Sequence, residues 1–352
     1  MKNATLSLLR PRSISLLAGI GLCTLATASA ETGDVISKTL TAAPGGTLIV
    51  DVDVGAIHVT GVEGSQAVIE VDRKVRAGSK DDEERILRES KVTIDQSGDT
   101  ITIRARTSKD SDASGWWNQL FGGHRTSRNF NFKITLPARY NVDLKTSGGG
   151  IDVTTLTGTV RVKTSGGGLA FEQIVGDIHG ATSGGGIHLD RCRGDVDVNT
   201  SGGGIRSDGG EGRIVLNTSG GGITVRKHQG NVKASTSGGG ITCDDIAGDV
   251  DAHTSGGPVN ATLTQPPVGE CRLSTSGGGV TVTLPANAAY QLDAETSGGG
   301  VHCDFPVTMT GNRKSDRLVA PVNGGGVLVH LRSSGGGIHV IKGPASVAAV
   351  EH

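Results

Sequence analysis

Apolar and polar residues alternate in two short runs that recur every 18 residues through the middle of the chain. Each unit is numbered here from the threonine of a Thr-Ser-Gly-Gly-Gly motif, or a close variant, as position 0. These threonines are Thr146, Thr164, Thr182, Thr200, Thr218, Thr236 and Thr254, followed at intervals of 21 by Thr275 and Thr296. Position 5 is aliphatic, position 7 mostly apolar, position 12 glycine, and positions 14 and 16 largely apolar. Two alternating runs bounded by glycine predict two strands and two turns in each unit.

A fixed period of this length is typical of stacked-repeat proteins. Eighteen extended residues reach roughly 60 Å, enough to circle a thin core once, so equivalent positions of successive units lie about 4.8 Å apart in parallel strands. Glycine permits the sharp corner, and the threonine hydroxyls at position 0 can bond one another or nearby carbonyls. We therefore predict an all-β fold, a parallel β-solenoid (single-stranded β-helix) of 18–21-residue coils. We expect it to be right-handed, as parallel crossovers nearly always are.

Three further glycine-rich architectures fit the pattern less well. A Gly/Ser linker would lack the apolar alternation. Collagen needs glycine at every third residue. The calcium-binding nonapeptide repeat needs the pattern G-G-x-G-x-D, which Gly-Gly-Gly-Ile-Asp does not supply.

The first 30 residues have the pattern of a secretory signal peptide. A basic start is followed by an apolar stretch from Ile14 to Leu25 and by the A-x-A site Ala28-Ser29-Ala30, which predicts cleavage after Ala30. No other apolar run is long enough to span a membrane. Removing Lys2, Arg10 and Arg12 from the 34 basic residues leaves 31 against 35 acidic ones, a net charge of −4. We expect an exported protein of the periplasm or cell surface, and the charge argues against nucleic acid as a partner.

The segments on either side of the regular repeat predict different elements. Residues 31–145 form the expected N-terminal β-rich cap, with one helix over Asp81–Ser90 and a hairpin turn at Ser97-Gly98-Asp99. Residues 146–342 form the expected solenoid, and 343–352 are a tail. The strands expected in the cap are Leu48–Val54, Ala56–Thr60, Val68–Val75, Val92–Ile94, Ile101–Ala105 and Phe130–Leu136.

The four cysteines after the signal region fall on apolar columns of the predicted stack. They are Cys192, Cys243, Cys271 and Cys303. Cys243 and Cys303 share position 7 three coils apart in sequence, which separates them by roughly 14 Å and excludes a bond between them. We interpret all four as small buried apolar residues. A Cys243–Cys271 bridge across the core stays open.

Position 8 holds an acidic side chain in three successive coils: Glu172, Asp190 and Asp208. Carboxylates stacked about 4.8 Å apart repel one another, and a divalent cation with oxygen ligands would relieve that repulsion. The simpler interpretation is a solvated acidic stripe balanced by Arg191 and Arg193. No further metal or cofactor site is predicted.

Both tryptophans of the chain lie in the polar segment Ser108–Arg128. Trp116, Trp117 and Phe121 there are candidates for docking a partner, a glycan or a lipid surface. The alternative is that they fold back as a lid on the first coil of the solenoid, because an open end of stacked strands needs a cap.

Sequence motifs for catalysis are missing. The chain has no HExxH, GxSxG, CxxC or Walker-type loop. The repeated serines have no histidine at a fixed spacing, and the repeat region carries few of the aromatic residues that polysaccharide-cleaving β-helices use as sugar platforms. We therefore expect a protein that is not an enzyme.

Several motifs resemble the bacterial putative-adhesin family of exported β-strand-repeat domains, whose function is unassigned. They are Pro44-Gly45-Gly46 before a strand, the run Gly55-x-Ile57-x-Val59, the step Leu136-Pro137, and the G-I-x-V…L-x-G-x-V-x-V units from Gly150 onward. The resemblance spans nearly all of the chain after the signal region. It implies an adhesin-like envelope or cell-surface interaction module with an unidentified envelope, glycan or protein partner. A periplasmic structural or envelope-stress scaffold and a polysaccharide-binding or -cleaving β-helix are the alternatives, and the oligomeric state is left open.

Overall fold

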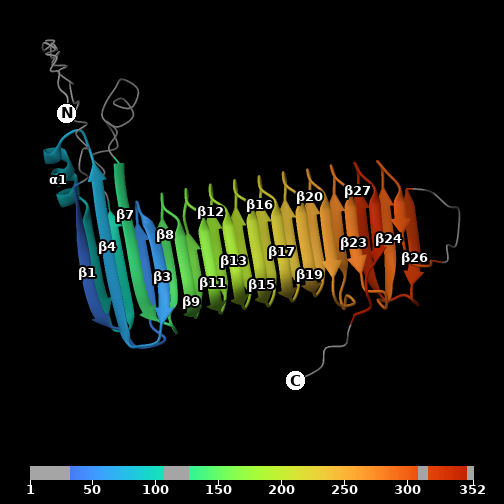
Figure 1. Cartoon of the computed structure of the whole chain (residues 1–352), viewed down its shortest axis with the longest axis horizontal. Coiled ribbons are helices and arrows are strands. Elements are labelled where there is room, and N and C mark those ends of the chain that lie inside the picture. The colour runs from blue at the N-terminus through green and yellow to red at the C-terminus, as the bar shows by residue number, and fades with distance from the viewer. Residues whose placement is uncertain (1–31, 107–126, 308–315, 347–352) are drawn as a thin grey trace, which may run out of the picture. The chain divides into compact units, whose positions relative to one another are not determined.

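Two parallel sheets of 14 strands pack against each other, and each coil of the chain gives one strand to each sheet (Figure 1). The computed structural model describes residues 32–106, 127–307 and 316–346. This architecture confirms the predicted all-β parallel solenoid. In the described part of the chain, no helix is both long and apolar enough to cross a membrane.

Sheet A contains most of the longer strands. Its spatial order is β1 (Thr32–Thr41), β4 (Gln66–Arg76), β7 (Ser127–Pro137), β3 (Ala56–Val62), β9 (Ile151–Thr157), β11 (Leu169–Val175), β13 (Ile187–Arg193), β15 (Ile205–Glu211), β17 (Ile223–Gln229), β19 (Ile241–Ala247), β21 (Val259–Leu263), β23 (Val280–Leu284), β28 (Ile338–Lys342) and β25 (Val301–Cys303).

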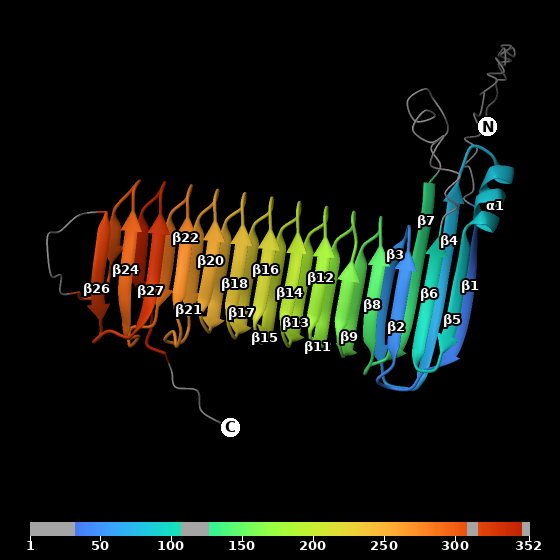
Figure 2. The same ribbon diagram turned by 180° about the vertical axis from the view of Figure 1, so that it is seen from behind.

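Sheet B is the second layer and is best followed from behind (Figure 2). Its spatial order is β26 (Arg317–Val322), β24 (Tyr290–Thr296), β27 (Val327–Ser333), β22 (Cys271–Thr275), β20 (Val250–Thr254), β18 (Val232–Thr236), β16 (Ile214–Thr218), β14 (Val196–Thr200), β12 (Ile178–Thr182), β10 (Val160–Lys163), β8 (Asn141–Thr146), β2 (Thr47–Val52), β6 (Thr100–Arg106) and β5 (Lys91–Ser97).

The core is a single apolar layer between the sheets. Ile187 and Leu189 of β13 point inward and are buried, as are Val196 and Val198 of β14 in the same coil. Because parallel strands stack in register, each of these residues repeats as a column, such as Leu169, Ile187, Ile205 and Ile223. Burying one such side chain contributes about 1.5–3 kcal/mol, and only neighbouring coils can complete the burial.

In each middle coil of sheet A the alternation of inward and outward side chains is interrupted at position 9, a feature that we call the bulge although neighbouring strands share it in register. There the backbone adopts a left-handed conformation, with φ between 50° and 64° at Thr155, Gln173, Arg191, Gly209, Lys227 and Asp245. The pairing between strands skips this position, so positions 8 and 9 both face solvent and position 10 turns back to the core. The bulge therefore displays two adjacent side chains per coil on the outer surface.

The Thr-Ser-Gly-Gly-Gly corner is held by a hydrogen bond from a buried threonine. The Thr200 hydroxyl donates to the Gly185 carbonyl of the preceding coil at 2.7 Å, and Thr182 donates in the same way to Gly167 at 2.6 Å. Position 3 must be glycine, because a Cβ on Gly203 would lie 2.2 Å from the Gly185 oxygen. Of the two partners expected for the threonine column, nearby carbonyls are the ones used.

At the N-terminal end, the strands leave sequence order. The coil β2–β3 stacks directly on β8–β9, and β6–β7 lies beyond it although it comes later in sequence than β3. The Thr146 hydroxyl donates to Gly55 O at 2.8 Å, so the run Gly55-x-Ile57-x-Val59 takes part in the same kind of corner. Antiparallel strands β1, β4 and β5 then close this end.

The helix α1 (Lys80–Glu89) contacts β1 and β4 at this end. The Ser79 side chain caps its N-terminus by accepting from the Asp82 N–H. Nearly buried Arg73 on β4 donates to the carbonyls of Leu87 and Ser90 at 3.2 and 2.6 Å, and this fixes the C-terminal end of the helix to the sheet.

At the C-terminal end, the last coil in the sequence is not the last coil in the stack. Strands β27 and β28 lie between β22–β23 and β24–β25, and β26 closes sheet B antiparallel to β24. Stacking in sequence order is thus wrong here. Cys243 and Cys303 are four strands apart in sheet A and not three, because β28 intervenes.

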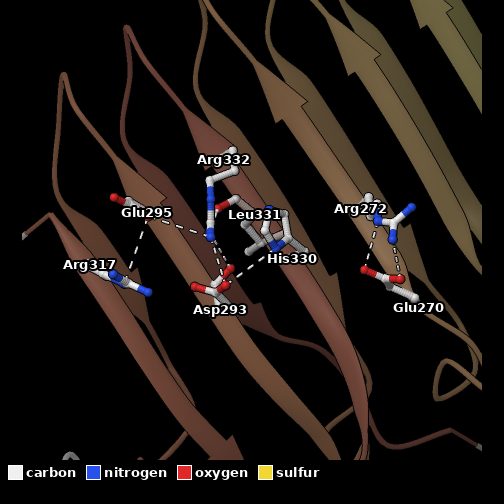
Figure 3. A network of polar contacts seen from close by, with 8 residues as sticks. All are labelled: Glu270, Arg272, Asp293, Glu295, Arg317, His330, Leu331 and Arg332. Atoms are coloured by element: carbon white, nitrogen blue, oxygen red, sulfur yellow. Dashed lines mark hydrogen bonds and ion pairs between the residues drawn. The ribbon is translucent and has the colours of Figure 1, made fainter.

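Charged side chains join the inserted coil to its neighbour (Figure 3). Arg332 on β27 donates to Asp293 Oδ2 on β24 at 2.8 Å and to the Asp293 carbonyl at 3.0 Å. This bond lowers the pKa of the Asp293 carboxyl below its ordinary value. His330 lies 3.5 Å from the same carboxylate, while Arg317 of β26 lies 4.0 Å from Glu295. The network links β24 to β26 and β27, which follow it in the sequence after a long excursion.

Local predictions for the cap agree with the structure: each expected strand overlaps an observed one, and the helix is found at Lys80–Glu89. Strand β1 was not predicted. Cys192, Cys243 and Cys271 are buried, Cys303 is half-buried, and all four thiols are free. The cap and solenoid boundary at 145/146 and the handedness stay predictions.

Candidate binding face on sheet A

The predicted acidic column forms a line of neighbours on the outer surface of sheet A. Register pairs Glu172 of β11 with Asp190 of β13, and Asp190 with Asp208 of β15. Arg191 Nη2 lies 2.8 Å from both Glu172 Oε1 and Asp190 Oδ2, and Arg206 Nε lies 2.5 Å from Asp208 Oδ2. Within residues 32–106, 127–307 and 316–346, no three His, Cys, Asp or Glu side chains are grouped to hold a metal ion. Arg191 and Arg206 supply the positive charge beside these carboxylates, whereas Arg193, which the sequence interpretation paired with the stripe, lies beside Glu211.

The other predicted candidate, Trp116, Trp117 and Phe121, lies outside the described residues. The choice between a partner-docking element and a lid on the first coil therefore stays a prediction.

An open hollow of about 380 Å³ lies on the outer surface of sheet A, across β11, β13, β15 and β17. We call it the Gly210 hollow. Its walls come from positions 9, 10 and 11 of four successive coils: Gln173, Val175, Arg191, Arg193, Gly210, Glu211, Lys227 and Gln229.

The hollow exists because one coil lacks a side chain at the outward-facing position 9. Position 9 carries a long side chain in the coils on either side, Arg191 and Lys227, but it is Gly209 in the coil between them. Position 10 of the same coil is Gly210, which the register places between Cys192 and His228. Two glycines at a bulge thus leave bare backbone flanked by basic residues.

A buried histidine lies next to this bare backbone on the core side. His228 is 2 % exposed, and its Nε2 lies 2.8 Å from the Gly212 carbonyl, so Nε2 carries the proton. Its buried Nδ1 has no hydrogen-bond partner among the described residues, and it lies 3.2 Å from the point where a Cβ on Gly210 would stand. Burial lowers the pKa of His228 below its ordinary value, which favours the neutral ring.

The cations around the hollow differ in how far they are already paired. Arg191 is shared between two carboxylates. Arg193 Nε lies 3.9 Å from Glu211 Oε2, and both side chains are well exposed. Among the residues that the structure describes, Lys227 has no ion-pair partner. Lys227 and Arg193 are therefore the groups best able to receive an anion.

A second hollow lies over β3 and β7, beside His58, Thr60 and Lys133. His58 Nδ1 is 2.8 Å from Asp152 Oδ2, so its polar group already has a partner within the protein. We do not assign a site there.

The buried thiols have the character of packing groups. Burial raises the pKa of Cys243 to about 12 and the pKa of Cys192 and Cys271 to about 11. A thiol with such a pKa is protonated at neutral pH and is a poor nucleophile. Their chemistry matches the sequence interpretation of small buried apolar residues.

The Gly210 hollow was not predicted from the sequence. Its signal was present as the glycine pair Gly209-Gly210, which interrupts the polar position 9 and the apolar position 10 of the repeat. What could not be foreseen was the bulge, because only the left-handed backbone at position 9 places both neighbouring side chains on one face.

A family model described as Toastrack DUF4097 matches residues 50–340 of the chain. No curated protein matches it. Among solved structures, the chain is similar to a "putative adhesin" from Parabacteroides distasonis, with 14 % identity, a TM-score of 0.41, and coverage of 88 % of this chain and 98 % of that one. It is also similar to a "putative adhesin" from Bacteroides fragilis, with 10 % identity, a TM-score of 0.34, and coverage of 88 % and 97 %. A "putative lipid binding protein" from Parabacteroides distasonis is 12 % identical, with a TM-score of 0.34 and coverage of 89 % and 98 %.

Proposed function

Because the chain belongs to the Toastrack DUF4097 family, we propose that it is an exported, non-enzymatic interaction module of the cell surface with an adhesin-like role. The observation that supports this most is the outer surface of sheet A. Its bulges present two adjacent side chains per coil in fixed columns, and the charge in those columns changes from coil to coil. Such a surface suits recognition of an extended partner.

The chemistry of the described residues also favours binding over catalysis. The buried thiols are protonated, and the carboxylates of the acidic column are paired with arginine. The Gly210 hollow is open and is lined by side chains that suit hydrogen bonding and charge pairing. A rigid surface of this kind loses little conformational entropy when it binds.

Exposure on intact cells is the first test of this function. A sequence-specific protease site inserted beside Val268, whose side chain is 84 % exposed in the turn between β21 and β22, offers a defined cleavage point. We expect cleavage when protease is added to intact cells. Protection until the envelope is permeabilised would contradict a surface role and would indicate an internal scaffold.

Binding and catalysis are then separated with purified protein. We expect the protein to sediment with isolated envelope material and to release no soluble sugar or lipid product from it on prolonged incubation. A chain that releases product would be an enzyme, and one that fails to sediment would not be an interaction module.

A further inference from the structure

We propose that the Gly210 hollow binds a carboxylate-bearing sugar unit of an acidic polysaccharide. This inference rests on the proposed function and names the ligand class of the same surface. The bound unit would occupy the outward gap left by Gly209 in β15, over the backbone of Gly210, with Lys227 and Arg193 contacting its carboxylate.

The gap is as wide as the one side chain that is missing between two basic side chains. Strands β13 and β17 flank β15, so Arg191 and Lys227 at position 9 are separated by about two strand spacings, roughly 9.6 Å at the backbone. In other coils the intervening side chain fills that space. Here it is open, and Lys227 of β17 and Arg193 of β13 can reach one anion from both sides.

The number of cations in the lining that are free to pair suits an anion with a single negative charge. Arg191 is already bonded to Glu172 and Asp190 and acts as a fixed wall. Lys227 is the unpaired cation in the described part of the lining, and Arg193 is held only loosely by Glu211. Charge-assisted hydrogen bonds from these two groups to one carboxylate are stronger than neutral ones.

The rest of the lining suits a sugar. Gln173 and Gln229 each offer an amide that both donates and accepts, which matches neighbouring hydroxyl groups. Val175 is 47 % exposed and offers an apolar patch against the C–H face of a ring. The carboxylate of Glu211 can accept a hydroxyl proton in a hydrogen bond.

Size and surroundings favour one unit of a chain over a protein segment. A volume of about 380 Å³ lies at the lower end of small-ligand pockets. Each of β13, β15 and β17 has a paired strand on both sides within sheet A, so an added β-strand has no edge to join. An open hollow also lets a polymer enter and leave at both ends.

The test uses trigalacturonate as the acidic ligand, with maltotriose as its uncharged counterpart and inorganic phosphate as a free anion. Affinities for the purified protein are measured by isothermal titration calorimetry. We expect trigalacturonate to bind and maltotriose to bind at least about tenfold more weakly, as the loss of a charged hydrogen-bonding group predicts. Phosphate that binds as tightly as trigalacturonate would overturn the assignment to a sugar.

Two variants address the site directly. Gly209→Gln places a glutamine side chain in the gap, and glutamine already occurs at position 9 as Gln173. The new Cβ would make only an ordinary contact, 3.7 Å from Arg191 Cγ. Lys227→Ala removes the unpaired cation. We expect each to weaken trigalacturonate binding by about tenfold or more.

Matched controls lie on the same fold. Thr155→Gln makes the corresponding change at position 9, outside the hollow lining, and Lys163→Ala removes an exposed lysine from sheet B. We expect both to bind as the unsubstituted protein does. Equal weakening by Lys163→Ala would mean diffuse charge attraction and would overturn the site.

Failure of this inference can be told apart from failure of the proposed function. Envelope sedimentation without any trigalacturonate binding would reject the acidic-sugar site and leave the interaction module standing. Loss of both would reject the two together. Trigalacturonate binding that Gly209→Gln leaves unchanged would reject the hollow as its place.

Discussion

The corner and the bulge both recur in every middle coil, yet their sequences obey opposite rules. At the corner, Thr200 is buried and bonded, and Gly203 has no room for a Cβ. At the bulge, position 9 holds Thr, Gln, Arg, Gly, Lys or Asp in successive coils with the same left-handed backbone. The residue type is therefore fixed where the backbones of successive coils touch, and it can vary where side chains project from the outer surface. Recognition is best sought at the bulge.

The largest expected effect breaks the corner. Gly149→Ala would bring a Cβ to 2.0 Å from Gly55 O, whereas the neighbouring Gly148→Ala would meet nothing within 4 Å. We expect Gly149→Ala to lower the free energy of unfolding by at least about 3 kcal/mol, as overpacking against backbone does. Urea denaturation of both variants checks this. Equal stability of the two would show that the glycine corner is not held by steric contact.

A smaller loss is expected from the threonine column. Thr200→Val keeps the shape but leaves the half-buried Gly185 carbonyl without its 2.7 Å hydrogen bond. The free energy of unfolding should fall by about 1–3 kcal/mol. Replacing the adjacent exposed Ser201 by Ala should change it by less than about 0.5 kcal/mol. A Ser201 effect as large as that of Thr200 would contradict the corner description.

His228 makes the coil beneath the hollow sensitive to acid. Its pKa is lowered in the folded protein relative to the ordinary value of 6.5, so the unfolded chain takes up a proton first as the pH falls. The stability due to neutral His228 is thus complete above pH 6.5 and is lost below it, toward the folded pKa. His228→Ile restores the residue of Ile174 and Ile246 at position 10. Urea titrations at pH 7.5 and pH 5 should show a smaller decline for the variant, and an equal decline would contradict this role.

The smallest effect on stability is expected at the bulge itself. Gly209→Gln forces a non-glycine residue into φ 64°, a conformation that Gln173 and Arg191 already adopt at the same position. We expect a cost of about 1 kcal/mol, against the larger loss for Gly149→Ala at the corner. Thermal melting gives the comparison. A bulge variant that unfolds the chain would show that both regions are under the same constraint.

Sequence periodicity predicted the stack of coils well because the same residue type recurs at the same position of every repeat. Stacking of equivalent residues accounts for the strand pairs of the middle coils and for the glycine corners. It also places the threonines in one column, although the sequence left open whether they bond one another or nearby carbonyls. The order of the ends was beyond such a rule. No local sequence pattern indicates that β27–β28 will lie between β22–β23 and β24–β25. That placement depends on which neighbouring coils pack best against it in three dimensions.

The candidate site was predicted less well for a related reason. The acidic column of Glu172, Asp190 and Asp208 was found, since it lies at one repeated position. The hollow is defined by the side chain that Gly209 lacks at position 9 and by a bulge that the period alone does not reveal. Sites made by a departure from a repeat need the backbone conformation before they can be seen.

The most direct test of recognition at the bulge compares two variants on isolated envelope material. Gly209→Gln fills the Gly210 hollow, and Thr155→Gln makes the same kind of change at position 9 outside it. Dissociation constants for the envelope are measured by sedimentation at fixed salt. We predict that Gly209→Gln binds at least about tenfold more weakly than the unsubstituted protein and that Thr155→Gln binds equally well. Equal binding by both variants would contradict recognition through the hollow.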